Sequence, residues 1–168
     1  VQLDNGLPGA WDLQRLPLAQ LNLKARHAQG LWQIQQAQAR MAAGQLQGQG
    51  QQNPQGWTGQ LDIQNLQPAL LHSAWRGPAV QGRLKAVATG ADTIGLSADL
   101  QAQKTQDAPS TGPAALQWEQ LQLTGQWHPD RWDIERLRLQ AFKAVLDAQF
   151  KWQPAQKALE GRMTLALP

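Results

Sequence analysis

The sequence contains no cysteine and no tyrosine, and only 16% of its residues are charged. Without thiols the chain forms neither disulfides nor thiolate metal sites, which suits an oxidising compartment as well as any protein that needs no thiols. Charged residues make up about 25% of a typical chain, and glutamine, at roughly one residue in six, fills the missing polar positions here. No apolar run approaches the roughly 20 residues of a membrane span, and no signal-peptide pattern is present.

Residue clusters typical of catalytic or metal sites are also lacking. His27, His72 and His128 are far apart and have no metal-ligand spacing. No two acidic residues have a spacing that favours acid–base catalysis, and no serine stands in a nucleophile-elbow context. The glycine-rich stretch 44–50 is not followed by the Lys-Ser/Thr of a phosphate loop. We therefore expect no enzyme activity, no cofactor and no metal.

The basic residues give a formal net charge of +3. Most of them alternate with apolar residues, so we interpret them as solvated outer faces of strands. Attraction to acidic partners, including anionic lipid head groups, is the alternative. Tryptophan interleaved with arginine can stack on single-stranded nucleic acid. Here, however, the 8 tryptophans occupy the same periodic positions as leucine and isoleucine, so we predict no nucleic-acid partner.

Alternation of apolar and polar residues at period two dominates the chain, and helical periodicity is nearly absent. The segments with this pattern are 18–27, 30–41, 44–50, 57–66, 80–89, 93–104, 116–127, 131–142, 144–152 and 159–167. The short links between them favour antiparallel meander pairing. Pro68 predicts a short helical turn near 68–74, with Trp75 folding back as a plug, and residues 105–113 are typical of an exposed loop.

The sequence repeats itself at an offset of about one hundred residues. Residues 16–23 have the apolar spacing of 116–123, and residues 32–39 match 132–139. A fixed repeat period is typical of a stacked architecture that offers an extended surface. We predict a first β-repeat unit at 1–105, a loop at 106–114 and a second, incomplete unit at 115–168, in a fragment of a longer protein.

Each of these four matching segments contains a slip in the alternation, in which two residues instead of one separate the second and third apolar positions. Keeping all four apolar side chains on one side of a sheet requires a bulge or a sharp bend, and the alternative is two strands joined by a kink. Because the segments come in pairs about 16 residues apart, we expect neighbouring strands to bend at the same level. The predicted fold is all-β, an elongated curved antiparallel sheet of roughly ten or more strands folded into a trough.

The segment 56–71, followed by 80–84, resembles the C-terminal β-repeat region of the TamB family, within the AsmA-like group of bacterial proteins. The resemblance lies in a strand with Trp57-x-Gly59-x-Leu61, a turn at Leu66-x-Pro68, then Trp75, then a strand with Gly82-x-Leu84. Residues 121–139 have a similar spacing of leucine, glycine and tryptophan, beginning with Leu121-x-Leu123-x-Gly125-x-Trp127.

This resemblance implies a β-taco-like sheet with an apolar interior groove, in a protein that is anchored in the inner membrane of Gram-negative bacteria and extends through the periplasm. It also implies a TamA-like outer-membrane barrel protein as partner. The implied roles are outer-membrane protein assembly and phospholipid transport between the two membranes.

From the one-sided apolar pattern we expect the strands to enclose a channel for phospholipid acyl chains, with the head groups at an open seam. The candidate lining residues are Leu21, Leu23, Leu46, Leu61, Ile63, Leu84, Leu121, Leu123, Ile134, Leu137, Leu139 and Leu146. The same side chains could instead pack on one another as a dry sandwich core. The rival functions are a scaffold that templates outer-membrane client strands by edge pairing, and a purely structural periplasmic spacer.

Overall fold

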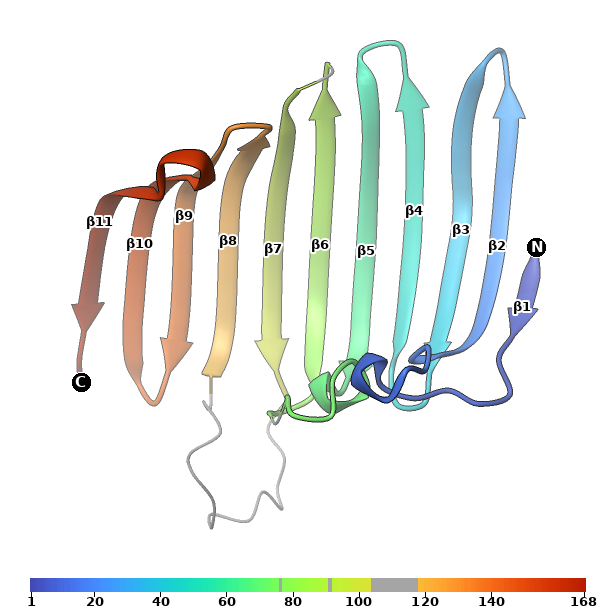
Figure 1. Cartoon of the computed structure of the whole chain (residues 1–168), viewed down its shortest axis with the longest axis horizontal. Coiled ribbons are helices and arrows are strands. Elements are labelled where there is room, and N and C mark those ends of the chain that lie inside the picture. The colour runs from blue at the N-terminus through green and yellow to red at the C-terminus, as the bar shows by residue number, and fades with distance from the viewer. Residues whose placement is uncertain (76, 91, 104–117) are drawn as a thin grey trace.

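The computed structural model describes residues 1–75, 77–90, 92–103 and 118–168, and within them the chain forms one antiparallel sheet of eleven strands in sequential order (Figure 1). The strands are β1 (Gln2–Asp4), β2 (Leu18–Ala28), β3 (Leu31–Met41), β4 (Gln45–Asn53), β5 (Gly56–Leu66), β6 (Val80–Thr89), β7 (Ile94–Ala102), β8 (Trp118–His128), β9 (Arg131–Ala141), β10 (Ala144–Gln153) and β11 (Ala158–Ala166). The predicted all-β antiparallel meander is thereby confirmed.

The ten predicted strands correspond to β2 through β11, and the short edge strand β1 was not expected. The helical elements of the described residues are three 3-10 turns: η1 (Trp11–Leu13), η2 (Pro68–Leu70) and η3 (Pro154–Gln156). The turn predicted near 68–74 is confirmed as η2. None of these turns has the length or the apolar character needed to cross a bilayer, and no other helix lies in the described ranges.

The predicted plug at Trp75 is wrong. Its backbone N–H donates to the carbonyl of His72 at 2.9 Å, which closes a tight turn after η2. This turn leaves the indole 52% exposed, stacked on the His72 ring with 5.4 Å between ring centroids.

Tight turns explain why successive strands pair with each other. Gln29 and Gly30 connect β2 to β3 with φ of +52° and +76°, and Phe142 and Lys143 connect β9 to β10 with φ of +51° and +67°. Positive φ at both central residues gives a turn whose twist matches that of the flanking strands. Each such turn returns the chain directly beside the strand it has just left.

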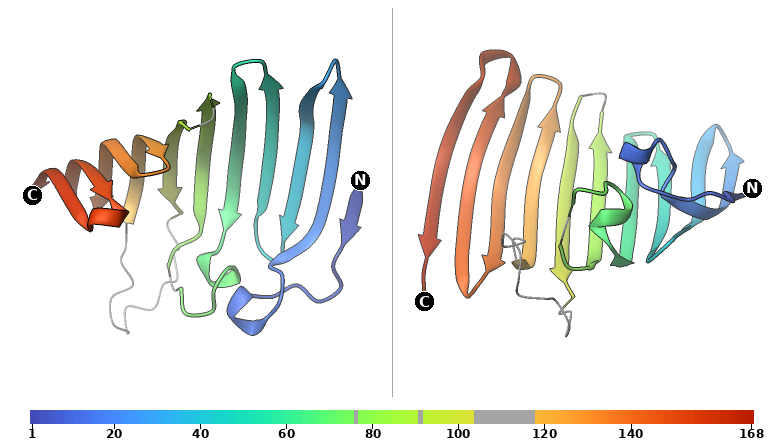
Figure 2. Two further views of the ribbon diagram at one scale, coloured as in Figure 1. Left: turned by 45° about the horizontal axis from the view of Figure 1, so that its top comes forward. Right: turned by 60° about the horizontal axis from the view of Figure 1, so that its bottom comes forward.

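The sheet is an open single layer that neither closes on itself nor curls strongly, so the described residues are not folded into the predicted trough and do not enclose a channel (Figure 2). The chain exposes 11765 Å² of surface, whereas a compact folded chain of this mass exposes about 8,200 Å². No second sheet and no long helix in the described part of the chain covers either face. A two-layer sandwich core is therefore absent from the described residues of this single chain.

Two segments, residues 5–17 and 67–75, meet at one end of the strands and are called the cap here (Figure 1). The N–H of Trp11 donates to the carbonyl of Leu71 at 3.0 Å. Asp12 accepts hydrogen bonds from both the backbone N–H and the hydroxyl of Ser73. These bonds hold the pKa of Asp12 below its ordinary value. The cap thus joins segments that lie about sixty residues apart in sequence.

Strands from both predicted repeat units belong to this one sheet, because β7 pairs with β8 along eight residue pairs. The division into units stays a prediction. The loop predicted at 106–114, and the corresponding boundaries at 105 and 115, lie outside the described residues.

Candidate functional site

All twelve candidate lining residues lie on one face of the sheet, here called the apolar face. Residues directly opposite each other on paired strands point to the same side, as do residues two apart along a strand. The first row crosses every strand: Leu3, Leu21, Ala39, Leu46, Ile63, Gly82, Leu100, Leu121, Leu139, Leu146 and Leu165. Six of the twelve candidates belong to it, and the row contains no polar side chain.

The second row runs parallel to the first, from β2 to β11, and holds five further candidates. Its members are Leu23, Ala37, Gly48, Leu61, Leu84, Ala98, Leu123, Leu137, Ala148 and Met163. The last candidate, Ile134, lies in a third row opposite Gly125 and Phe150. Ten of the twelve side chains are half-buried, while Ile63 and Ile134 are buried at 8% and 9% exposure.

Bulges at the predicted slips keep the rows on one face. The extra residues are Ala19 in β2, Gln35 in β3, Glu119 in β8 and Glu135 in β9. Because each extra residue restores the phase of the alternation, Ile134 and Leu137 both point to the apolar face although three positions separate them. The prediction of a bulge in each of the four segments is confirmed.

The expectation that neighbouring strands bend at the same level is wrong. The bulge in β2 lies opposite Arg40 and Met41, near the cap, whereas the bulge in β3 lies opposite Lys24 and Ala25. Antiparallel neighbours run through the same pattern in opposite directions, so a slip near the start of each strand falls at different heights. Bulges at the same height occur instead in β2 and β8, and in β3 and β9.

Sequence reasoning missed the small members of the rows, such as Ala37, Gly48 and Gly82. Alanine and glycine give a weak apolar signal, and only the strand register reveals their place. At Gly82, with φ of +146°, an added Cβ would collide with the carbonyl oxygen of Asp99. A glycine therefore allows the close approach of β6 and β7 at this point.

A further feature missed at the sequence level is a row of tryptophans across the hairpin end of the apolar face, opposite to the cap. This tryptophan row consists of Trp32, Trp57, Trp127, Trp132 and Trp152. Trp132 lies directly opposite both Trp127 and Trp152. A Cβ added at Gly59 would come within 3.5 Å of Cζ3 of Trp57, so this indole leans back over the face.

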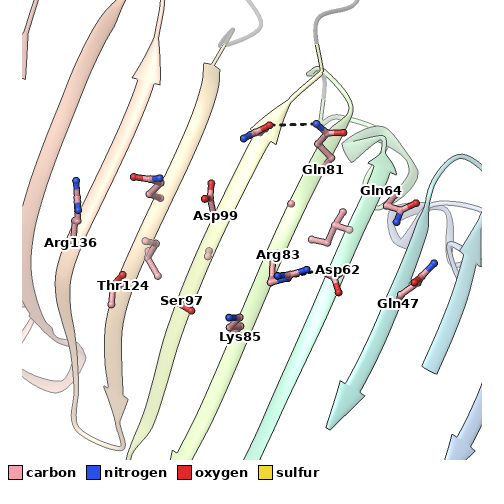
Figure 3. Close-up of a pocket in the computed structure, with 16 residues that line it drawn as sticks. Gln47, Asp62, Gln64, Gln81, Arg83, Lys85, Ser97, Asp99, Thr124 and Arg136 are labelled. Carbon is pink, nitrogen blue, oxygen red and sulfur yellow. Dashed lines mark hydrogen bonds and ion pairs between the residues drawn. The ribbon is translucent and has the colours of Figure 1, made fainter. Parts of the chain in front are cut away.

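The opposite face of the sheet is polar. Glutamines face each other across β6 to β9 in the row Gln81, Gln101, Gln120 and Gln140. An open hollow of about 1020 Å³ lies mainly on this face across β4 to β9 (Figure 3). Amides, hydroxyls and charged groups make up most of its lining, and of the twelve candidate residues only Ile63 and Leu123 contribute to it, so it is not the predicted apolar groove.

Charge pairs on the polar face are exposed or partly buried. Arg83 lies opposite Asp62, with 2.6 Å between Nε and Oδ1 (Figure 3). Hydrogen bonds from Gln60 and Arg83 hold the pKa of Asp62 below its ordinary value. At the hairpin end, Oδ2 of Asp133 accepts from Nε of Arg131 at 3.0 Å, and this bond raises the pKa of Arg131. Such pairs are typical of a solvated sheet face.

The histidines are dispersed, in keeping with their spacing in the sequence. His27 packs on Trp32, and Nε2 of His128 lies 3.5 Å from Oδ2 of Asp133. Among the described residues no group of three histidine, cysteine or acidic side chains is placed to hold a metal ion.

No protein-family model, curated protein or solved structure matches this chain. The resemblance to the TamB family therefore stays a prediction. What the geometry offers is an uncovered apolar face, unbroken across eleven strands and bounded by the cap at one end and the tryptophan row at the other.

Proposed function

We propose that this chain is a periplasmic segment of a TamB-like bridge between the inner and outer membranes, and that its apolar face carries phospholipid acyl chains. The observation that supports the proposal most directly is the first apolar row, which continues from Leu3 to Leu165 without a polar side chain. A contiguous apolar surface of this extent on a single layer is typical of an interaction site.

The energetics of such a face suit transport. Each buried methylene of an acyl chain contributes about 0.8 kcal/mol, so contact with many half-buried leucines holds a chain without one specific pocket. Apolar residues, from glycine to leucine, recur at every strand spacing of about 4.8 Å. A lipid that slides across the sheet exchanges one apolar residue for the next and meets no polar side chain in the first row.

The cellular setting follows from the resemblance. The parent protein would be anchored in the inner membrane, with the anchor outside this segment, and would meet a TamA-like barrel protein at the outer membrane. Lipid supplied along this route supports outer-membrane biogenesis, including assembly of outer-membrane proteins.

Lipid extraction tests the proposal. The chain is purified from membranes without detergent, extracted with organic solvent and examined by mass spectrometry, and we expect co-purified phospholipid. The double variant Leu123→Asp/Leu139→Asp places charges on the apolar face and should abolish lipid recovery. Its matched control, Gln122→Asp/Gln140→Asp, alters the same two strands on the polar face and should retain the lipid.

Two results of the lipid extraction would contradict the proposal. Folded wild-type chain that yields no phospholipid contradicts the proposal, as does equal loss of lipid from both double variants. Circular dichroism of each variant confirms that the sheet is retained before lipid is compared.

The templating scaffold is the second candidate, and strand β11 favours it. Eight of its nine residues are exposed, and among the described strands it pairs with β10 alone. Its free edge leaves backbone N–H and C=O groups available to an added strand. Crosslinks from Arg162 or Thr164 to nascent outer-membrane proteins, without bound lipid, would establish this function in place of lipid transport. A purely structural spacer would give neither result.

A further inference from the structure

The two ends of the apolar face differ in chemistry. Five of the 8 tryptophans lie in the tryptophan row at the hairpin end, and Trp32 and Trp57 expose 57% and 43% of their surface there. Tryptophan combines a large apolar ring with an N–H donor, and it is enriched where hydrocarbon meets lipid head groups. The hairpin end therefore has the character of a hydrocarbon–water boundary.

The opposite end has a different construction. The strand ends at Leu18 and Leu66 lead into the cap, whose two segments are held together by the hydrogen bonds between Asp12 and Ser73. Met41, at the end of β3, is only 7% exposed. Over β2 to β6 the cap lies across this end, whereas the described connections at the hairpin end are short turns, among them η3 between β10 and β11 (Figure 2).

The depth between the two ends matches a lipid tail. Along β8, Trp127 lies six positions after Leu121 of the first row, which is about 20 Å at 3.3 Å per residue. One leaflet of a bilayer provides about half of the 30 Å hydrocarbon thickness. An acyl chain lying along the strands thus fits between the tryptophan row and the cap.

We propose that the tryptophan row is the head-group side of the lipid path, so that phospholipids lie with their tails parallel to the strands and the tail ends toward the cap. This inference rests on the proposed function and adds an orientation to it. The lipid then travels across the strands, sideways to its own long axis, while its glycerol and phosphate stay at the level of the tryptophan row, whose indoles come from β3, β5, β8, β9 and β10.

Trp118 is the one tryptophan of the sheet at the cap end. It lies opposite Ala141 and is half-buried. Its neighbours at this level in β9 and β10 are Ala141 and Ala144, not further tryptophans. Trp11 and Trp75, 55% and 52% exposed, lie in the cap and not in the sheet. On the apolar face itself the cap end therefore has a single half-buried indole, and its position makes Trp118 a local marker for the tail end.

Two photoactivatable probes test the orientation. One is a phosphatidylethanolamine with a diazirine on the head group, and the other carries the diazirine at the end of an acyl chain. Each is loaded onto the purified chain and irradiated, and crosslinked peptides are mapped by mass spectrometry. We expect head-group crosslinks near Trp127 and Trp132, and tail-end crosslinks near Leu121, Leu139 and Trp118.

A pair of variants tests the role of the indoles. Trp127→Leu/Trp132→Leu keeps the apolar surface but removes two N–H donors, so bound lipid should fall less than twofold while head-group crosslinks at this end fall at least fivefold. Trp75→Leu changes an exposed tryptophan outside the sheet and should leave both readouts unchanged.

The outcomes separate this inference from the proposed function. Crosslinks of both probes spread evenly over the rows, or in the reverse order, overturn the orientation and leave lipid binding intact. Absence of crosslinks to the apolar face with either probe overturns both. A dimer in light scattering whose apolar face excludes both probes also overturns both, because a second copy would then occupy the face.

Discussion

Arg83 donates a hydrogen bond from Nε to Oδ1 of Asp62 at 2.6 Å, across the β5–β6 pair. On the other face of the same two strands, Ile63 lies directly opposite Gly82 in the first apolar row. One step along each strand thus separates a solvated ion pair from the apolar surface. This separation of the two faces, repeated from strand to strand, is what the period-two sequence pattern specifies.

The first prediction concerns acid stability. The pKa of Asp62 lies below its ordinary value of 3.8 in the folded chain, because Gln60 and Arg83 donate hydrogen bonds to the carboxylate. A depressed carboxyl pKa contributes stability above the unfolded pKa, and that contribution is lost as pH falls from 3.8 through the folded pKa. Asp62→Asn should therefore reduce the difference in unfolding free energy between pH 6 and pH 2.5.

Urea unfolding at the two pH values measures this difference. Asp92→Asn, at an exposed position before β7, serves as the control and should leave it unchanged. An Asp62→Asn variant with the same loss of stability in acid as the wild type would contradict the assignment.

The second prediction compares two positions of the same apolar row. Ile63 is 8% exposed at the centre of the sheet, and Leu165 is 60% exposed in the edge strand β11. Truncating a buried isoleucine to alanine costs about 2–4 kcal/mol, whereas an exposed site costs well under about 1 kcal/mol. Chemical unfolding of Ile63→Ala and Leu165→Ala followed by tryptophan fluorescence should show this order, and equal costs would contradict the register.

The third prediction concerns the glycine of that row. Gly82 has φ of +146°, and an added Cβ would collide with the carbonyl of Asp99 on β7. Gly82→Ala should therefore destabilise the chain by about 2 kcal/mol or more, since backbone rather than a flexible side chain must move. Gly6→Ala, where no atom lies within 4 Å of the added carbon, is the matched control. If both variants unfold at the same urea concentration, the close approach of β6 and β7 is wrong.

The sequence allowed prediction of the strands and of the twelve apolar side chains because both depend on local alternation. The irregularities at Gln35 and Glu135 were predictable for the same reason, since a slip in phase requires a bulge or a sharp bend if the rows are to stay on one face. Their relative heights were not predictable, because these depend on the register between strands. The contact of Asp12 with Ser73 is equally non-local, and no sequence pattern indicates it.

The tryptophan row is another feature that the sequence alone did not predict. Trp32, Trp57 and Trp132 occupy ordinary apolar positions in the sequence, and only the register aligns them across the sheet. The hollow on the polar face likewise depends on how long side chains from β4 to β9 are spaced. Features made by alignment of distant strands therefore require the structure.

The fourth prediction uses the turn between β9 and β10. Phe142 and Lys143 have φ of +51° and +67°, a conformation that asparagine and glycine adopt at far lower cost. Phe142→Asn/Lys143→Gly should therefore raise the unfolding free energy by about 1 kcal/mol, and the loss of a phenylalanine that is 56% exposed should also raise solubility.

The turn between β2 and β3 offers a comparison. Its residues Gln29 and Gly30 have φ of +52° and +76°, so Gln29→Asn produces the same Asn-Gly pair there. This variant should stabilise the chain by a smaller amount, because the turn already contains one glycine. Thermal unfolding measures both, and a lower midpoint for either variant would show that its turn has a different backbone conformation.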